Sequence, residues 1–204
     1  MIRISLVGDI GSGKSHIAKL FNYPLFNADL EVSKIYRTEK KSCLKIKKAF
    51  PKIDFTFPIK KDKLVKCILS KKDNIKKLSK IVHPIIRKKL KLFLKKNKKK
   101  KIVILDIPLY LENKLFLKND IVVFISAKND SIKRRLIKRK GHNKRLIKLF
   151  KSIQLPLYKK RQRANYIIKN NFTNKTAKKS VKYILDQIFY ERNNTRHRNN
   201  WNKH

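Results

Sequence analysis

The residues best suited to chemistry form one short run, GDIGSGKS, at positions 8–15. Glycines at this spacing let the backbone curl so that its N–H groups point inward, an arrangement that holds phosphate oxygens. The lysine can then reach the β- and γ-phosphates of a nucleotide, and the hydroxyl after it can ligate Mg²⁺. A strand is expected just before the run and a helix just after it, which is the context that a phosphate-binding loop (P-loop) requires. The predicted nucleotide contacts are Gly8, Gly11, Ser12, Gly13, Lys14, Ser15 and His16.

The glycine content argues against a chance turn. The chain of 204 residues has only four glycines, and three of them fall within residues 8–13. A sequence that otherwise avoids glycine keeps it where the backbone needs conformations that other residues disfavour. The P-loop alone does not separate kinases from GTPases, ATPases or motor domains. The chain is short for a motor and has no guanine-recognition motif of the N-K-x-D type.

Two carboxylates are expected beside this loop. Asp29 follows a short strand expected at residues 25–27, and Asp106 ends an apolar strand at 102–106. Ligands of parallel sheets bind at the carboxyl ends of the strands, so both carboxylates should lie near the P-loop. Asp29 is the candidate to hold and deprotonate an acceptor hydroxyl, or else it caps the next helix. Asp106 would be satisfied by a water-mediated Mg²⁺ contact or by Ser15, or else it is purely structural.

Alternating strands and helices must position these residues. Apolar periodicity fills residues 30–97 with helical patterns, interrupted at Pro51 and Pro58. The pattern predicts an α/β fold, a P-loop NTPase-type parallel five-stranded sheet flanked by helices. The expected strands are 2–7, 25–27, 102–106, 120–125 and 166–168, and the expected helices outside the insertion are 15–21, 132–139 and 181–189. We expect one domain over 1–190, with a helical insertion at about 30–97, and a disordered polar tail over 191–204.

The composition is strongly basic, with 56 Lys and Arg against 13 Asp and Glu and a net charge of +43. Such a surface attracts polyanions, but the basic residues are spread over most segments and do not form one stripe. Compositional drift in an AT-rich coding sequence explains this better than a nucleic-acid partner. The two cysteines form no CxxC pair, and no signal peptide or membrane span is visible. We therefore expect a cytoplasmic protein without a specific nucleic-acid or membrane partner, and a monomer.

Shorter motifs follow the P-loop in a fixed order. They include NAD at 27–29, VHP at 82–84, DIPLYLE at 106–112 and RLIKR followed by Gly141 at 135–141. A last group comprises Gln154, Pro156, Lys160, Ala164 and Asn170. In order and spacing, from about Met1 to Asn171, the chain resembles the dephospho-CoA kinase family, whose opening motif is GGIGSGKS. Each later motif is weak alone, whereas together they are specific.

The resemblance implies transfer of the γ-phosphoryl group of ATP to the ribose 3′-hydroxyl of dephospho-CoA, with Mg²⁺. It implies catalytic roles for Lys14, Asp29 and Arg139, with Arg139 in a lid at about 133–160 that folds over ATP. Ser15 and Asp106 would then form the Mg²⁺ site. Substrate contacts would come from Asp29, His83, Pro108 and Glu112, with Glu112 paired to a basic residue. The simpler alternatives are a core or capping role for His83 and a solvated basic face for Arg139.

The chain departs from the family pattern at several positions. Asp9 replaces a glycine, Asn27 replaces the first Asp of D-A-D, Ser33 replaces a common Arg, Lys140 replaces an acidic residue, and Asn165 replaces the Asp of A-D. Ser33 puts one substrate contact in doubt. Two other functions stay open: another small P-loop kinase for a nucleoside or nucleotide, and a nucleic-acid-binding P-loop protein.

Overall fold

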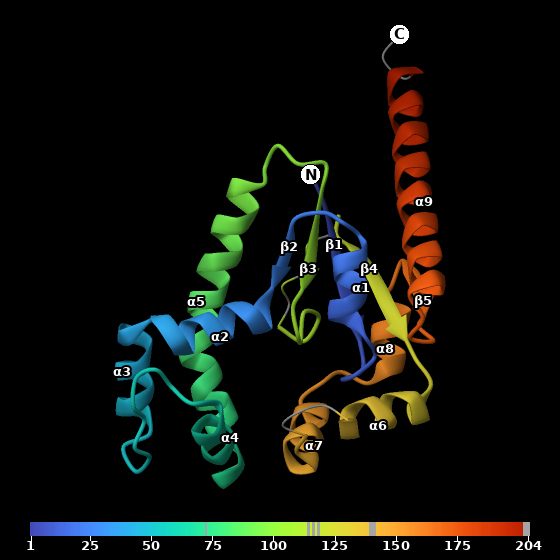
Figure 1. Cartoon of the computed structure of the whole chain (residues 1–204). Coiled ribbons are helices and arrows are strands. Elements are labelled where there is room, and N and C mark those ends of the chain that lie inside the picture. Colours follow the sequence, from blue (N-terminus) through green and yellow to red (C-terminus); the bar gives the residue numbers. More distant parts are fainter. Residues whose placement is uncertain (72, 114, 116, 118, 139–141, 202–204) are drawn as a thin grey trace.

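The computed structural model describes residues 1–71, 73–113, 115, 117, 119–138 and 142–201, with side chains described up to Asn194. At its centre is a five-stranded, all-parallel sheet in the order β2-β3-β1-β4-β5 (Figure 1). The strands are β1 (Ile2–Gly8), β2 (Leu25–Asn27), β3 (Ile102–Asp106), β4 (Ile121–Ser126) and β5 (Tyr166–Lys169). The predicted fold class is therefore confirmed. Because β1 lies in the middle, the loop that follows it has the ends of β3 and β4 on either side.

Helices cover both faces of the sheet. On one face, α1 (Lys14–Leu20) and α9 (Asn174–Trp201) bury an apolar cluster that includes Ile4 of β1, Ile17 of α1 and Val181 of α9. The opposite face of the sheet, with Phe26, Leu105 and Phe124, belongs to a second cluster that continues into the helical insertion. The central strands β1, β3 and β4 are buried on both faces, which explains why they are almost continuously apolar.

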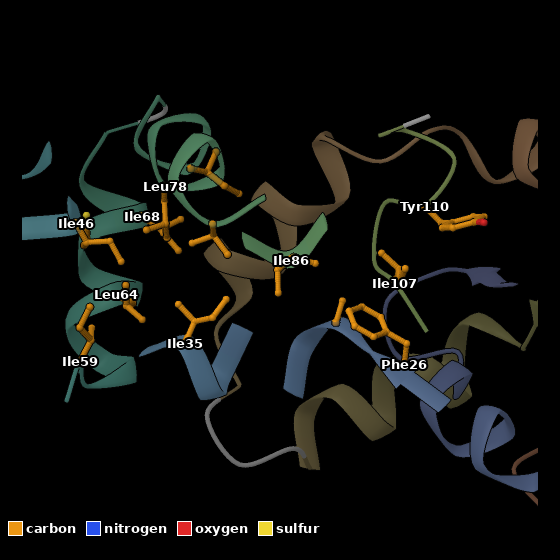
Figure 2. Packing of buried hydrophobic residues seen from close by; sticks show 14 of the residues in the cluster. Phe26, Ile35, Ile46, Ile59, Leu64, Ile68, Leu78, Ile86, Ile107 and Tyr110 are labelled. Atoms are coloured by element: carbon orange, nitrogen blue, oxygen red, sulfur yellow. The ribbon is translucent and has the colours of Figure 1, made fainter. Parts of the chain in front are cut away.

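The insertion between β2 and β3 is helical, as the periodicity predicts. It consists of α2 (Ala28–Thr38), α3 (Lys40–Ala49), α4 (Lys61–Ser70) and α5 (Asn74–Lys96). Pro51 and Pro58 lie between α3 and α4, whereas Pro84 is accommodated inside α5. Figure 2 shows apolar side chains that run from the insertion helices to the edge of the sheet: Ile46, Leu64, Ile68, Ile35, Ile86, Phe26, Ile107 and Tyr110. The insertion and the sheet therefore share one core.

Three helices follow β4 on the side of the strands' carboxyl ends (Figure 1): α6 (Asn129–Lys138), α7 (Lys144–Ser152) and α8 (Leu157–Gln162). They span most of the segment expected as a lid. None of the side chains of α7 is fully buried, although this helix contacts α4 of the insertion. Among the described residues, no helix is long and apolar enough to cross a membrane.

The C-terminal end of the chain differs from the expectation. We expected a closing helix over 181–189 and a disordered tail from 191, but α9 begins at Asn174 and continues to Trp201. Residues 174–201 contain neither glycine nor proline, so the sequence has no strong helix breaker there. Among the described side chains of α9 the last buried one is Ile188, and Figure 1 shows the end of the helix projecting beyond the sheet.

A buried ion pair joins the start of β1 to the segment before β4. Arg3 donates from Nε and Nη2 to the Asp120 carboxylate at 2.5 and 2.6 Å, and the Tyr110 hydroxyl donates to the same carboxylate at 2.6 Å. The Asp120 side chain is 2% exposed and that of Arg3 is 14% exposed. Loss of the carboxylate charge would leave the guanidinium almost buried without its counter-ion.

We therefore expect Asp120→Asn to lower the free energy of unfolding by about 3 kcal/mol. Urea unfolding followed by circular dichroism measures this change. The control is Asp130→Asn, because Asp130 pairs with Lys133 at 4.0 Å with 86% of its side chain exposed. That change should cost less than about 0.5 kcal/mol. Equal effects of the two substitutions would show that the buried pair does not stabilise the sheet.

Candidate active site

The P-loop has the backbone conformations that its glycines were predicted to supply. Gly11 and Gly13 have φ values of +84° and +96°. A Cβ at Gly13 would lie 2.3 Å from Nδ2 of Asn170, and a Cβ at Gly8 would lie 2.5 Å from the Ile125 carbonyl oxygen. Asn170, just after β5, donates from the same Nδ2 to the Ser12 carbonyl at 2.8 Å. The loop is therefore fixed against the ends of β4 and β5, and Gly8 and Gly13 leave no room for a side chain.

Lys14 folds back over this loop. Its Nζ donates to the carbonyl oxygens of Asp9 at 2.8 Å and of Gly8 at 3.3 Å. Burial lowers the pKa of Lys14, an effect that the nearby carboxylates of Asp106 and Asp29 oppose. Ser12 Oγ is buried and has no hydrogen-bond partner among the described residues. A cation and an unsatisfied hydroxyl within a curled loop fit the phosphates of a nucleotide.

Asp106 lies at the end of β3 beside the start of α1. It is 4% exposed, and its Oδ2 accepts from Asn27 Nδ2 at 2.7 Å. Burial raises its pKa, while a hydrogen bond with Ser15 and the charge of Lys14 act in the opposite direction. The sequence had suggested Ser15 as a possible partner of this carboxylate.

The donors at Ser15 and Asp106 fit a magnesium ion. Mg²⁺ prefers hard oxygen ligands and is usually held by one or two protein groups together with phosphates and water. The hydroxyl of Ser15 and the carboxylate of Asp106 supply such oxygens next to the phosphate loop. In the described part of the chain, no group of three or more His, Cys, Asp or Glu residues could hold a metal without a nucleotide.

Asp29 lies in the first turn of α2, where it is exposed. Its alternative role as the cap of this helix belongs instead to Asn27, whose Oδ1 accepts from the Leu30 N–H at 2.9 Å. The charge of Asp29 raises the pKa of Lys14, so the carboxylate lies close to the P-loop lysine. Asp29 is therefore not the cap of α2, and it lies at the edge of the sheet where the phosphates would bind.

A second lysine is buried near the P-loop. Lys160 of α8 is 3% exposed, and its Nζ lies 2.9 Å from Glu112 Oε1 and 3.0 Å from Gln154 Oε1. Glu112 also accepts from the Leu155 N–H at 2.9 Å. The charge of Lys160 lowers the pKa of Lys14, which places the two ammonium groups in the same region. The expected pairing of Glu112 with a basic residue is thus present, whereas the sequence gave Lys160 no role of its own.

The other predicted site residues are more dispersed. His16 is exposed, with Nε2 2.8 Å from Asn174 Oδ1 at the start of α9. Pro108 is half-buried in the turn after β3. His83 is half-buried within α5, where burial and, to a lesser extent, Arg87 lower its pKa. Arg139 lies outside the described residues, as do Lys140 and Gly141.

Comparison with known proteins decides the family. The family model described as dephospho-CoA kinase matches residues 2–176. The chain belongs to the dephospho-CoA kinase family. This is a family of ATP-dependent kinases. The resemblance to this family that the sequence motifs indicated is confirmed.

Relatives of the dephospho-CoA kinase family match along almost their whole length. The dephospho-CoA kinase of Wolbachia sp. subsp. Brugia malayi is 34% identical over 190 residues, covering 91% of this chain and 97% of the relative. That of Zymomonas mobilis is 33% identical over 173 residues, covering 83% and 88%. Among solved structures, TT1252 from Thermus thermophilus has a TM-score of 0.71 at 25% identity, covering 91% and 97%. The dephospho-CoA kinase from Campylobacter jejuni shares the fold, with a TM-score of 0.59 at 22% identity, covering 91% and 96%.

The geometry explains two departures from the dephospho-CoA kinase pattern. An aspartate at position 27 would place a second carboxylate against Asp106, whereas the amide of Asn27 donates to it at 2.7 Å and removes the like-charge repulsion. Asn165 Oδ1 accepts from the Val122 N–H at 2.8 Å, a contact that an aspartate oxygen could also make. Ser33 is half-buried, and its carbonyl accepts from Nε of the exposed Arg37 at 3.4 Å. Nothing in the structure explains the change to serine.

Proposed function

We propose that this chain transfers the γ-phosphoryl group of ATP to the ribose 3′-hydroxyl of dephospho-CoA, giving ADP and CoA. The observation that carries the proposal is the convergence of Lys14, Asp29 and Asp106 beside the P-loop. Phosphoryl transfer needs alignment and charge neutralisation more than covalent chemistry, and this group of residues supplies both. The names of the relatives and the motifs after the P-loop support dephospho-CoA as the acceptor.

Each residue of this group has a distinct task. The P-loop N–H groups and Lys14 bind the β- and γ-phosphates and stabilise the charge that develops during transfer. Ser15 would ligate Mg²⁺, and Asp106 would hold it directly or through water. When bound, this metal neutralises and orients the phosphate oxygens. Asp29 orients the 3′-hydroxyl and accepts its proton. The 3′-oxygen then bonds to the γ-phosphorus, and the bond from that phosphorus to the β,γ-bridging oxygen breaks, leaving its electron pair on ADP.

The remaining residues are proposed to position the substrates. Dephospho-CoA would contact His83 of the insertion, Pro108 after β3 and Glu112. A neutral imidazole at His83 is favoured by its lowered pKa, so this side chain would act as a hydrogen-bonding group. Arg139 would neutralise the transferring phosphoryl group from the lid. We place the reaction in the cytoplasm, with which two free, buried cysteines agree.

A coupled ADP-release assay with ATP and a panel of acceptors tests this function. The panel contains dephospho-CoA, nucleosides, nucleoside monophosphates and short RNA. We expect release that depends on dephospho-CoA, with CoA as the product detected by chromatography, and loss of release when EDTA removes Mg²⁺. Release with a nucleoside or nucleotide instead would keep the kinase and overturn the acceptor. Folded protein that releases no ADP with any acceptor would overturn the catalytic role.

A further inference from the structure

The carboxylate that replaces a family glycine inside the P-loop has a partner. Asp9 is 7% exposed, and its Oδ2 accepts from Nζ of Lys151 in α7 at 2.9 Å. Its Oδ1 accepts from the Ile10 N–H at 2.7 Å. Both carboxylate oxygens of Asp9 are therefore engaged, one of them by a cation 142 residues away in the sequence.

The same residue also holds the P-loop lysine. The carbonyl oxygen of Asp9 accepts from Lys14 Nζ at 2.8 Å. A displacement of Asp9 would therefore move an atom that orients Lys14. Asp9 connects three elements: the loop, its lysine and α7.

The partner comes from α7, whose side chains are at most partly buried. Leu146, Leu149 and Phe150 of this helix pack against the core that the sheet and the insertion share, and the helix also contacts α4. The Lys151 side chain is 46% exposed, whereas the Asp9 side chain is 10% exposed. An ion pair with one nearly buried member is less screened than an ordinary surface pair.

An unpaired carboxylate at this position would oppose nucleotide binding. The phosphates of ATP carry several negative charges, and like charges a few ångströms apart repel strongly where water is partly excluded. A neighbouring cation removes most of this repulsion. The pair therefore explains how the chain carries an acidic residue within its phosphate loop.

We propose that Lys151 is a positioning residue of the ATP site, which neutralises the Asp9 carboxylate and ties α7 to the P-loop. This inference rests on the proposed use of ATP. The site needs Lys151 because Asp9 is present. The effect of losing Lys151 should therefore depend on the residue at position 9.

A double-mutant cycle tests this dependence. The variants are Lys151→Met, Asp9→Gly and the double variant, and the measurements are the Kd for Mg²⁺-ATP by calorimetry, the KM for ATP and kcat. We expect Lys151→Met alone to weaken ATP binding about tenfold, because it leaves one unpaired negative charge. In the Asp9→Gly background, Lys151→Met should change the Kd for Mg²⁺-ATP by less than about twofold.

The matched control is Lys148→Met, which removes an exposed lysine from the same helix. It should change the Kd by less than about twofold. Equal effects of Lys151→Met with and without Asp9→Gly would mean that Lys151 acts independently of the carboxylate and would overturn the proposal. So would a Lys151→Met variant indistinguishable from the control. Failure of the unaltered protein to bind Mg²⁺-ATP would overturn the proposed function and this inference together.

Discussion

Replacement of Lys14 by methionine is expected to lower kcat/KM by about a thousandfold, the magnitude typical for loss of a cation or donor that stabilises developing charge. The Lys14 ammonium donates hydrogen bonds to the carbonyl oxygens of Gly8 and Asp9. It also interacts electrostatically with the carboxylates of Asp106 and Asp29. Methionine has a similar length, so the change removes the charge with little loss of packing. Steady-state kinetics with ATP and dephospho-CoA measure the effect.

The fold should survive this substitution. The pKa of Lys14 is lowered in the folded protein, which means that folding disfavours the charged form at neutral pH. Removal of this charge should therefore leave the thermal midpoint unchanged or raise it, because a group with a lowered folded pKa costs stability while it is protonated. The control is Lys19→Met on the exposed side of the same helix, α1. A Lys14→Met variant that unfolds, or one that keeps normal turnover, would contradict this account.

Local patterns predicted most of what positions this lysine. The strands expected at 25–27 and 102–106 coincide with β2 and β3, because short apolar runs that end in polar residues are typical of buried parallel strands. The helix expected at 15–21 is α1, displaced by one residue. The rule that ligands bind at the carboxyl ends of parallel strands also placed Asp106 near Ser15.

Long-range pairings could not be predicted in the same way. Lys151 is one of 56 basic residues, and nothing in its helix distinguishes it from Lys148 as the partner of Asp9. The burial of Lys160 could not be predicted either, because lysine side chains are usually exposed. These contacts depend on how α7 and α8 pack against the sheet and the insertion, which periodicity does not determine.

The cap of α2 shows a second limit of prediction from the sequence. From the sequence, only Asp29 was expected as a possible cap of this helix, although asparagine is as common as aspartate at that position. The cap is Asn27, because this residue ends β2 and its side chain accepts a hydrogen bond from the Leu30 N–H. Because Asp29 is not the cap of α2, its contribution to catalysis can be tested without loss of the capping hydrogen bond.

Substitution of Asp29 by asparagine is therefore expected to lower kcat at least about a hundredfold, the range for loss of a general base. The amide has nearly the same shape but cannot take the proton of the 3′-hydroxyl. The Kd for Mg²⁺-ATP should change by less than about threefold, because the P-loop and Lys14 remain in place. Single-turnover kinetics with dephospho-CoA, together with calorimetry of ATP binding, separate the two effects.

A matched control distinguishes catalysis from the electrostatics of helix ends. Asp62 is an exposed carboxylate in the first turn of α4, as Asp29 is in the first turn of α2. Either substitution weakens the interaction with its helix dipole by about 0.5 kcal/mol, so the thermal midpoints of the two variants should fall by similar small amounts. Only Asp29→Asn should lower turnover. Near-normal kcat in folded Asp29→Asn protein would remove this carboxylate from the mechanism and leave alignment by the P-loop, Lys14 and the metal ligands as the source of catalysis.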